Sequence, residues 1–380
     1  MKSLRKQFDK LKPNFEKGGK LAPFRSFFDA IETLFFVPNT TSKSGVHIHD
    51  HKDSKRLMII VVFAMVPALL FGMWNTGYQH FLSLGQSVDI WTSFWYGFLQ
   101  VLPIIIVSYA VGLGIEIVIA QMRGHEVKEG FFVSGMLIPL ILPVETPLWM
   151  VAVATAFAVI IGVEAFGGAG MNILNPALTA RAFLFFAYPS HMSGDAVWIA
   201  NKADGFSGAT PLAEAAAGHI QNLPSPADMF FGFIPGSIGE TSTLAILIGA
   251  FILIYTGVGS WKIMLSVGIG GLVMGLLLNA LAVNPFMELP AYYHLLMGGF
   301  AFGAVFMATD PVTAAQTNRG KYIYGFLIGI MAVLIRVFNP AYPEGMMLAI
   351  LLLNVFAPLI DHYVVQANVK RRLKRVKVKA

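Results

Sequence analysis

The sequence predicts an all-α integral membrane protein with about ten transmembrane helices, and three observations point to this class. Hydrophobic residues make up 56% of the 380 residues and charged residues only 13%, whereas a soluble domain carries about 25% charged residues. The mean hydropathy is +0.66. Apolar runs recur along the chain, and one extended polar break divides them into two groups. A large soluble enzyme is therefore disfavoured.

The apolar runs approach the length of about 20 residues that a helix needs to cross a bilayer. The five runs before the polar break cover residues 57–74, 95–120, 131–144, 147–163 and 173–188. The five runs after it cover residues 243–260, 263–283, 293–309, 322–338 and 345–360. Asn175-Pro176 and Asp310-Pro311 interrupt two of these runs. Because discontinuous helices at membrane depth usually line a site, we expect a site near these breaks.

The distribution of basic residues predicts the orientation of the chain. Twelve Lys and Arg precede the first run, and seven more lie within residues 370–379. Basic segments stay on the cytoplasmic side, so both termini should be cytoplasmic and the central polar break should lie on the outer face. The predicted domains are a basic, amphipathic segment (1–56), a first membrane repeat (57–188), an outer loop (189–242), a second membrane repeat (243–361) and a basic tail (362–380).

Two groups of five spans predict an inverted repeat, because an odd number of spans reverses the second copy relative to the first. A weak internal similarity supports this prediction: residues 167–180 are echoed by residues 298–315, and Asn175-Pro176 corresponds to Asp310-Pro311. Pseudo-symmetry of this kind predicts a shared site near the midplane of the membrane.

A short polar stretch, Asp204 to Thr210, stands out within the outer loop. Gly205 and Gly208 allow tight turns, and small residues leave the Thr210 hydroxyl uncrowded. We interpret this stretch as a handle for a covalent flavin, in which the hydroxyl would be esterified to the phosphate of FMN and Asp204 would help to position the donor. The alternative is an ordinary polar loop. Ser207 and Ala209, with Gly208 between them, also belong to the candidate attachment segment.

Composition also restricts the chemistry and the partners of the chain. There is no cysteine, so the chain forms no disulfide and supplies no thiolate to an iron–sulfur cluster. No glycine-rich dinucleotide fingerprint follows a strand pattern, so an NADH site is expected on another polypeptide. The sequence pI of about 9.3 is explained by membrane topology, which predicts a lipid bilayer and no nucleic acid as partner.

The chain resembles, along essentially its whole length, the family that contains the NqrB protein of the sodium-translocating NADH:quinone oxidoreductase and the RnfD protein of the Rnf complex. The segments that carry the resemblance are 172–177, 181–189, 193–195, 204–210 and 356–361. The N-terminal segments 15–20 and 33–38 favour the sodium pump over the shorter Rnf protein. Proteins of this family resemble urea transporters in their five-plus-five inverted architecture, which agrees with the predicted repeat.

The resemblance implies a set of cofactors and partners. Thr210 would carry FMN through a phosphoester that a separate flavin transferase installs. Electrons would pass from this FMN through a noncovalent riboflavin to quinone, coupled to Na⁺ export. The resemblance also implies assembly with the A, C, D, E and F components of the pump in the bacterial inner membrane. Asn172 and Asn175 would bind riboflavin, since an amide both donates and accepts hydrogen bonds; the alternative is that both side chains cap the broken helix.

Six further residues are candidates for the quinone site and the sodium path. Glu116 lies in a strongly apolar run, where a carboxylate usually has a function, and we assign it with Gly112 to the quinone site. The family pattern here is Gly-Gly-x-x-Glu, but Leu113 replaces the second glycine. A carboxylate that reaches the cytoplasmic interface is the alternative. Sodium prefers oxygen ligands, and the acidic candidates are Asp310 and Asp361, followed by Asp29 and Glu344. Capping, or pairing with an arginine such as Arg336, is the alternative for each of them.

Three other functions stay open on the sequence alone. An Rnf-like subunit would keep the flavin but take part in ferredoxin-linked electron flow. A channel or carrier for a small polar solute would explain the spans, the repeat and the broken helices without a flavin on Thr210. A purely structural membrane subunit would lack both the flavin and solute flux.

Overall fold

The structure is a computed structural model that describes residues 2–15, 54–123, 130–339 and 344–377, together with residues 19, 28, 32, 36 and 45. Within these residues the regular elements are helices, and no β-strand is present. The prediction of an all-α protein is therefore confirmed at this level.

Six of the described helices are long and apolar enough to cross a membrane. They are α3 (Ser54–Ser83), α4 (Ile90–Arg123), α6 (Leu148–Ile160, continued by turns to Phe166), α11 (Trp261–Leu281), α15 (Asn318–Phe338) and α16 (Met346–Lys377). Three shorter apolar helices accompany them, namely α5 (Gly130–Leu140), α7 (Pro176–Ala187) and α10 (Thr243–Tyr255). These helices coincide with nine of the predicted apolar runs. The chain is a multi-pass membrane protein, while ten spans in an inverted repeat remain a prediction.

The remaining predicted run, residues 293–309, is broken into short pieces. It contains α13 (Tyr293–Leu296), α14 (Phe300–Phe302) and a π-helical turn, η5 (Gly303–Met307). The Ala308 amide donates to the Gly303 carbonyl at 2.7 Å. Such π turns are often found at functional sites, and this one leads directly into Asp310-Pro311.

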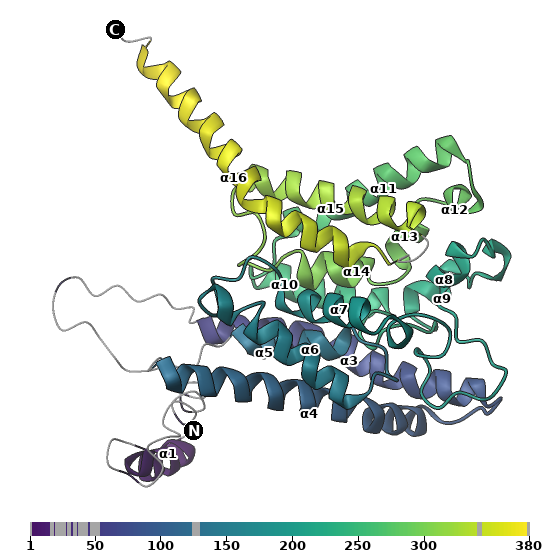
Figure 1. Cartoon of the computed structure of the whole chain (residues 1–380), viewed down its shortest axis with the longest axis horizontal. Coiled ribbons are helices and arrows are strands. Elements are labelled where there is room, and N and C mark those ends of the chain that lie inside the picture. The colour runs from purple at the N-terminus through teal and green to yellow at the C-terminus, as the bar shows by residue number, and fades with distance from the viewer. Residues whose placement is uncertain are drawn as a thin grey trace.

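The helices pack closely because small residues lie at their contacts. Figure 1 shows α3 beside α4 and α11 beside α15, and α16 packs on α15. A Cβ atom at Gly97 would lie 1.7 Å from the Met73 carbonyl oxygen of α3, and one at Gly329 would lie 2.2 Å from the Val267 carbonyl oxygen of α11. Such close backbone contact is typical of helices that associate in lipid, where apolar burial gives little driving force.

The two proline breaks meet in space. Asn175 Nδ2, at the start of α7, donates to Asp310 Oδ2 at 3.4 Å. The sequence separation between these residues is 135, so the contact joins the two predicted membrane repeats. This agrees with the expectation that both breaks belong to one site.

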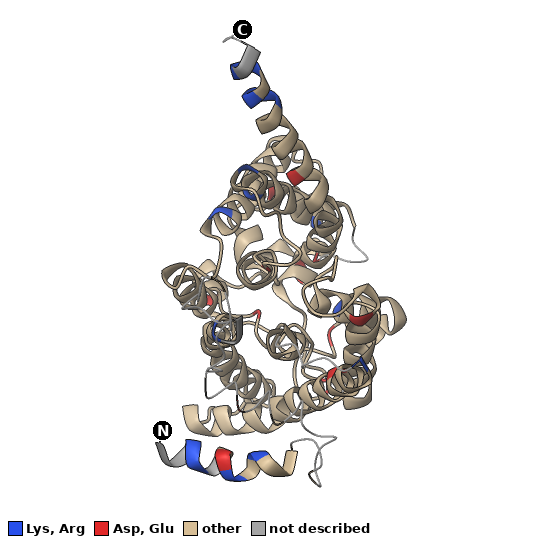
Figure 2. Cartoon of the chain, turned by 90° about the vertical axis from the view of Figure 1, so that its left-hand side faces the viewer, with Lys and Arg blue, Asp and Glu red and all other residues tan. Residues whose placement is uncertain are grey.

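The helices within residues 189–242 lie at one end of the molecule, and α1 (Lys2–Phe15) and the C-terminal part of α16 lie at the other. In Figure 1, α8 (Pro211–Ala216) and α9 (Pro226–Phe231) are at the right, whereas α1 and the C-terminal part of α16 are at the left. Figure 2 shows Lys and Arg on α1 and on the projecting end of α16. The predicted boundary at residue 361 falls inside α16. The other short elements are η2 (Glu164–Phe166), η3 (Pro189–His191), η4 (Ile220–Asn222) and α12 (Pro285–Glu288).

Candidate functional site

Thr210 stands at the start of a short helix in the outer loop. Its Oγ1 accepts a hydrogen bond from the Ala213 amide at 3.2 Å, which makes Thr210 the N-cap of α8. The preceding residues form a compact turn: Gly205 has φ +82°, and a Cβ atom at Gly208 would lie 2.5 Å from the Asp195 carbonyl oxygen. Local sequence therefore fixes the position of the Thr210 hydroxyl through a turn on one side and a cap on the other.

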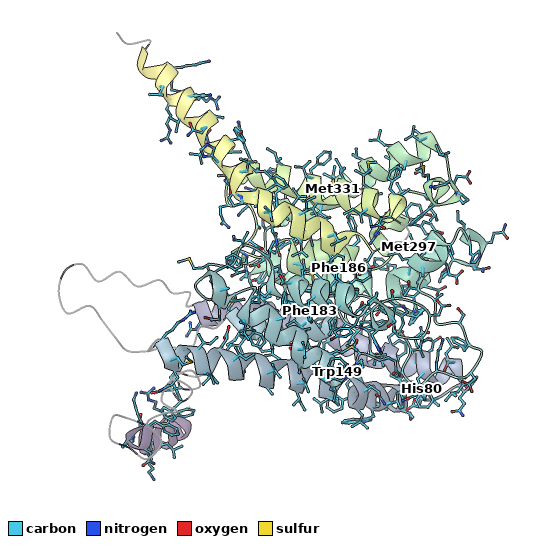
Figure 3. All side chains as sticks on the ribbon, in the orientation of Figure 1. His80, Trp149, Phe183, Phe186, Met297 and Met331 are labelled. Carbon is cyan, nitrogen blue, oxygen red and sulfur yellow. The ribbon has the colours of Figure 1, made fainter. Side chains whose placement is uncertain are left out.

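The loop that leads to Thr210 is fastened to itself and to the membrane helices. Lys202 Nζ donates to the Asp195 and Phe206 carbonyl oxygens, both at 3.1 Å. His80 of α3, labelled in Figure 3, lies with Nδ1 2.8 Å from the Ala200 carbonyl oxygen, and its ring stacks on that of Tyr96 with centroids 4.1 Å apart. These contacts hold the loop against the ends of α3 and α4.

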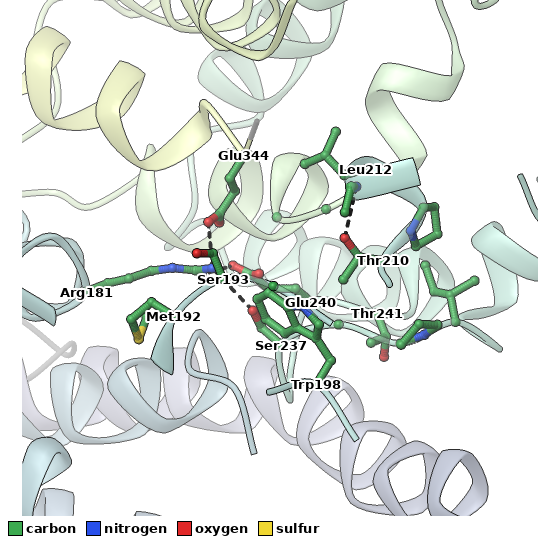
Figure 4. A pocket seen from close by; sticks show the side chains of 18 of the residues that line it. Arg181, Met192, Ser193, Trp198, Thr210, Leu212, Ser237, Glu240, Thr241 and Glu344 are labelled. Atoms are coloured by element: carbon green, nitrogen blue, oxygen red, sulfur yellow. Dashed lines mark hydrogen bonds and ion pairs between the residues drawn. The ribbon is translucent and has the colours of Figure 1, made fainter. Parts of the chain in front are cut away.

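A cavity opens beside Thr210 and contains about 710 Å³ of empty space, counting the solvent at its mouth. Figure 4 shows it from close by. Its wall combines α7, the outer loop, the segment between α9 and α10, and the glycines that precede α14. The lining residues are Arg181, Phe185, Met192, Ser193, Gly194, Trp198, Thr210, Pro211, Leu212, Ala213, Ile234, Pro235, Gly236, Ser237, Glu240, Thr241, Gly298, Gly299 and Glu344.

A buried charge cluster forms one side of the cavity. Arg181, on α7, is 3% exposed. Its Nη1 donates to Glu240 Oε1 at 2.9 Å, and its Nη2 lies 2.6 Å from Glu344 Oε2. Glu240 belongs to the non-helical segment before α10, and Glu344 precedes α16, so one guanidinium joins three parts of the chain. Burial raises the pKa of the Glu240 carboxyl, Arg181 opposes that rise, and Glu344 adds to it.

The kinds of residue that line the cavity suit a flavin ring. Trp198 and Phe185 form an aromatic part of the cavity wall. Gly298 and Gly299 also line the cavity, where larger side chains would reduce its volume. The buried Thr241 hydroxyl has no hydrogen-bond partner within the described part of the chain. A planar aromatic group would match the apolar part of this wall.

The other residues of the predicted attachment segment shape the loop rather than the cavity. Asp204 and Ser207 are exposed, and Gly208 is buried against Asp195. Ser207 Oγ accepts from the Ala209 amide at 3.5 Å. Of this segment, the residue that lines the cavity is Thr210. A role of Asp204 in positioning the flavin donor therefore concerns the loop surface, and it stays a prediction.

The two candidate riboflavin residues lie at the start of α7 and have internal partners. Asn175 Oδ1 accepts from the amides of Ala177 at 3.0 Å and Leu178 at 3.2 Å, as an N-cap does. Asn172 Nδ2 donates to the Leu174 carbonyl oxygen at 3.0 Å. The capping alternative is thus present for Asn175, whereas Asn172 holds the turn before the helix, and riboflavin binding stays a prediction for both. Arg181 follows Asn175 by six residues, about 9 Å along the axis at ~1.5 Å per residue.

The candidate quinone residues share one buried face of α4, where it packs on α5. Gly112 and Glu116 are both buried and one turn apart. A Cβ atom at Gly112 would lie 1.8 Å from Phe131 Cζ, so the ring of Phe131 fills the space that the missing side chain leaves. Tyr109 lies one turn earlier, and its hydroxyl donates to the Phe132 carbonyl oxygen at 2.7 Å. The quinone assignment stays a prediction.

The acidic candidates for the sodium path act as local anchors. Asp310 accepts from the Val312 amide and the Thr313 hydroxyl, each at 3.0 Å. Asp361 accepts from the amides of Gln316 at 2.6 Å and Thr317 at 3.0 Å, which fastens the start of α15 to α16. Across the described ranges, no three His, Cys, Asp or Glu side chains gather in a way that could hold a metal ion.

Of the two weaker acidic candidates, Glu344 and Asp29, the structure describes only Glu344. The Glu344 carboxylate pairs with Arg181, whereas Arg336 Nε donates to the Glu344 backbone carbonyl at 2.9 Å. Glu344 therefore pairs with an arginine, as the alternative for this residue expects, and this arginine is Arg181. Asp29 lies outside the described residues.

Sequence reasoning missed most of the cavity wall. Trp198, Glu240 and Thr241 belong to no recognisable motif, and they meet Thr210 only through the fold. One signal was available, because Arg181 is a charged residue within an apolar run and such residues usually have a partner. The partner itself, Glu240, lies 59 residues away in sequence.

Comparison with known proteins agrees with this description. A model of the NQR2, RnfD, RnfE family matches residues 41–370. A relative from Chromohalobacter salexigens, the B subunit of a "Na(+)-translocating NADH-quinone reductase", is 50% identical over 98% of this chain and 96% of its own length. Relatives of the same name from Ectopseudomonas mendocina and Azotobacter vinelandii are 51% and 48% identical, each over 98% of this chain and 99% of its own length. The chain belongs to the NQR2, RnfD, RnfE family.

Proposed function

We propose that this chain is the B subunit of a sodium-translocating NADH:quinone reductase, and that Thr210 carries FMN with its ring in the adjoining cavity. The names and full-length similarity of the relatives support the subunit assignment. The single observation that supports the flavin is that Thr210, predicted as the attachment residue, lies in the wall of a cavity that aromatic side chains and Arg181 also line.

The chain's own residues would fix the flavin in three ways. Thr210 would supply the ester oxygen at a position set by the Gly205–Gly208 turn and by the start of α8. Trp198 and Phe185 would exclude water from the ring. Arg181, held by Glu240 and Glu344, would provide a rigid charged wall. When bound, FMN supplies reversible electron transfer, and a rigid polar surrounding sets how readily that transfer occurs.

Helix α7 connects the proposed flavin site with the broken-helix site. Arg181 contributes to the cavity, and Asn175 caps the same helix close to Asp310. We therefore propose that riboflavin binds near Asn172 and Asn175. For the quinone we keep the site proposed from the sequence, Gly112 and Glu116 on the buried face of α4. We expect NADH oxidation on another subunit, because the sequence carries no glycine-rich dinucleotide fingerprint after a strand pattern.

The arrangement in the membrane supports electron flow that begins at FMN near the outer face and continues through riboflavin to quinone. The outer loop with Thr210 lies at the end of the molecule opposite to α1 and the basic end of α16. With the termini in the cytoplasm of a bacterial cell, Thr210 faces outward, where a flavin-bearing partner protein can reach it. A flavin transferase would act on the same exposed loop during assembly.

We assign the sodium path to the loop from Asp310 to Thr317 and to Asp361, which fastens its far end. Backbone carbonyls and hydroxyls around such a break can supply the oxygen ligands that sodium needs. Loss of sodium stimulation in an Asp310→Asn complex would support this assignment, and unchanged stimulation would exclude Asp310.

Intact mass and in-gel fluorescence of the denatured subunit test the flavin proposal. The subunit is co-expressed with a flavin transferase and its partner proteins, as wild type, Thr210→Ala and Thr210→Ser. We expect a flavin-sized mass increment and fluorescence in the wild type and their complete loss in Thr210→Ala. Thr210→Ser retains the hydroxyl and should keep a measurable fraction of the flavin.

A matched control separates attachment from helix capping. Ser225 caps α9 in the same outer loop, where its Oγ accepts from the Asp228 amide at 3.2 Å. Ser225→Ala therefore removes an equivalent cap and should leave the flavin in place. An unmodified wild-type chain despite active transferase would reject the flavin and favour a solute transporter.

A further inference from the structure

The C-terminal part of α16 projects away from the other helices. Residues 362–377, here called the projecting segment, continue α16 for about 24 Å beyond Asp361 at a rise of ~1.5 Å per residue. Figure 1 shows this segment extending past the end of α15. The Asp361 carboxylate accepts from the Gln316 and Thr317 amides at the start of α15. The projecting segment therefore begins directly after the contact that holds α16 to the bundle.

One face of the projecting segment is apolar and open. Its large apolar side chains recur at intervals of four residues, which places them within ~80° of one another around the helix. They are Val365, Val369 and Leu373, with exposed fractions of 48%, 43% and 57%. Within the described part of the chain, this apolar stripe is therefore uncovered.

Lipid does not account for the apolar stripe. Asp361 and the basic start of α15, with Arg319 and Lys321, mark the polar edge of the helix bundle. The headgroup layer on one side of a bilayer is roughly 5–8 Å thick, whereas Leu373 lies ~18 Å beyond Asp361 along the helix axis. Residues 359–377 contain no glycine and no proline, so the segment lacks the usual cause of the sharp bend that would lay the stripe on the membrane.

The charges around the apolar stripe are all positive. The exposed basic side chains that the structure describes here are Lys370, Arg371, Arg372, Lys374 and Arg375. No Asp or Glu occurs within residues 362–380. At 3.6 residues per turn, Lys370 and Arg372 border the stripe, whereas Arg371 and Lys374 lie on the far side of the helix. An apolar stripe bordered by cations is complementary to a helix whose apolar stripe is bordered by carboxylates.

We propose that the projecting segment is the docking surface for an acidic helix of a partner subunit. The partner helix covers the stripe from Val365 to Leu373, and its carboxylates pair with Lys370 and Arg372. The proposal takes from the proposed function only that the chain is one subunit of a complex, and it does not depend on the flavin. With the termini in the cytoplasm, the partner helix lies on the cytoplasmic side. Figure 2 shows the basic residues of this segment standing clear of the bundle.

The test uses single cysteines, because the chain has none of its own. Val369→Cys places a cysteine in the stripe, and Ala367→Cys places one ~200° away on the opposite face. Both positions are exposed. Each complex is purified with its partner subunits, placed in bilayer discs that contain phosphatidylglycerol, labelled with benzophenone maleimide and irradiated. Mass spectrometry then identifies what the labelled peptide of this chain is joined to, with the wild-type complex as the baseline.

Paired substitutions in the Val369→Cys chain test the role of charge. Lys370→Gln with Arg372→Gln removes two charges beside the stripe. Arg371→Gln with Lys374→Gln removes two charges from the far side. Both pairs change the net charge equally, so a difference between them reports the position of the charges.

We expect Val369→Cys to join a segment of a partner subunit that is rich in Asp and Glu, with a yield severalfold above that of Ala367→Cys. The pair beside the stripe should lower this yield severalfold, and the pair on the far side should leave it nearly unchanged. Equal yields from the two faces, equal effects of the two charge pairs, adducts to phosphatidylglycerol alone, or a joined segment without carboxylates would each overturn the docking proposal. A chain that purifies without partner subunits would instead contradict the proposed function.

Discussion

At the scale of single residues, the contacts of a side chain decide what a candidate residue can do. Gly112 is a clear example, because its missing side chain leaves space that the Phe131 ring occupies. Glu116 lies one turn further along the same buried face of α4. The shape of this proposed quinone site therefore depends on a contact between two helices, which a glycine in the sequence does not reveal.

We predict that Gly112→Ala displaces Phe131 and weakens quinone binding. The new Cβ atom would lie 1.8 Å from Phe131 Cζ, and overpacking of this kind costs about 1–3 kcal/mol. Quinone titration of the purified complex should give a severalfold higher KM for the variant. Thermal unfolding would measure the accompanying loss of stability.

Gly114→Ala is the control for this prediction. It lies on the same helix, and a Cβ atom there would meet nothing within 4 Å. Its stability should be unchanged or slightly higher, because alanine favours the helix over glycine by about 1 kcal/mol. An equal rise of KM in both variants would show that helix composition, rather than the Phe131 contact, governs the quinone site.

At the scale of helices, the breaks at Asn175-Pro176 and Asp310-Pro311 are the features that matter most. The Asn175 side chain makes two kinds of contact: its Oδ1 caps α7, and its Nδ2 donates to Asp310. Asparagine and serine are comparably good caps. A serine at this position therefore separates the capping role from any role of the amide.

We predict that Asn175→Ser keeps the helix but loses the noncovalent riboflavin. Acid precipitation of the purified complex, followed by measurement of flavin in the supernatant, reports this loss, while FMN on Thr210 stays with the protein. Asn284→Ser is the matched control, because Asn284 Oδ1 caps α12 by accepting from the Met287 amide at 2.8 Å. Full riboflavin in Asn175→Ser would leave the side chain with a structural role only.

The extent of the helices could be predicted from sequence, because bilayer thickness imposes a length that apolar runs display directly. The runs 95–120 and 263–283 correspond to α4 and α11 within a few residues. The division of residues 293–309 into short helical pieces was harder to predict, because no particular amino-acid composition marks a π turn. The partners of Arg181 could not be predicted, because a pairing across 59 residues depends on how helices pack and not on local pattern.

At the scale of the whole molecule, Arg181 joins the first half of the chain to the second. Its partner Glu240 lies near the end of the outer loop, and its partner Glu344 lies just before α16. We predict that Arg181→Met destabilises the protein by about 3–5 kcal/mol, because it leaves buried carboxylates without their cation. A lowered thermal unfolding midpoint of the purified complex would measure the effect.

A surface ion pair provides the comparison. Arg123 Nη1 lies 2.7 Å from Glu164 Oε2, but its side chain is 46% exposed. Arg123→Met should cost less than about 1 kcal/mol, as exposed pairs usually do. If both variants unfolded at the same temperature, the buried cluster would not be what holds the halves together.

The Arg181 cluster also has a consequence for biogenesis. The ribosome must add 59 further residues before Glu240 exists, which takes several seconds at ~5–20 residues per second. During that interval a nascent apolar helix carries a guanidinium with neither carboxylate available. The insertion machinery must therefore retain α7 near water or protein until the second half is translated. Chains truncated before Glu240 should accumulate as substrates of membrane proteases.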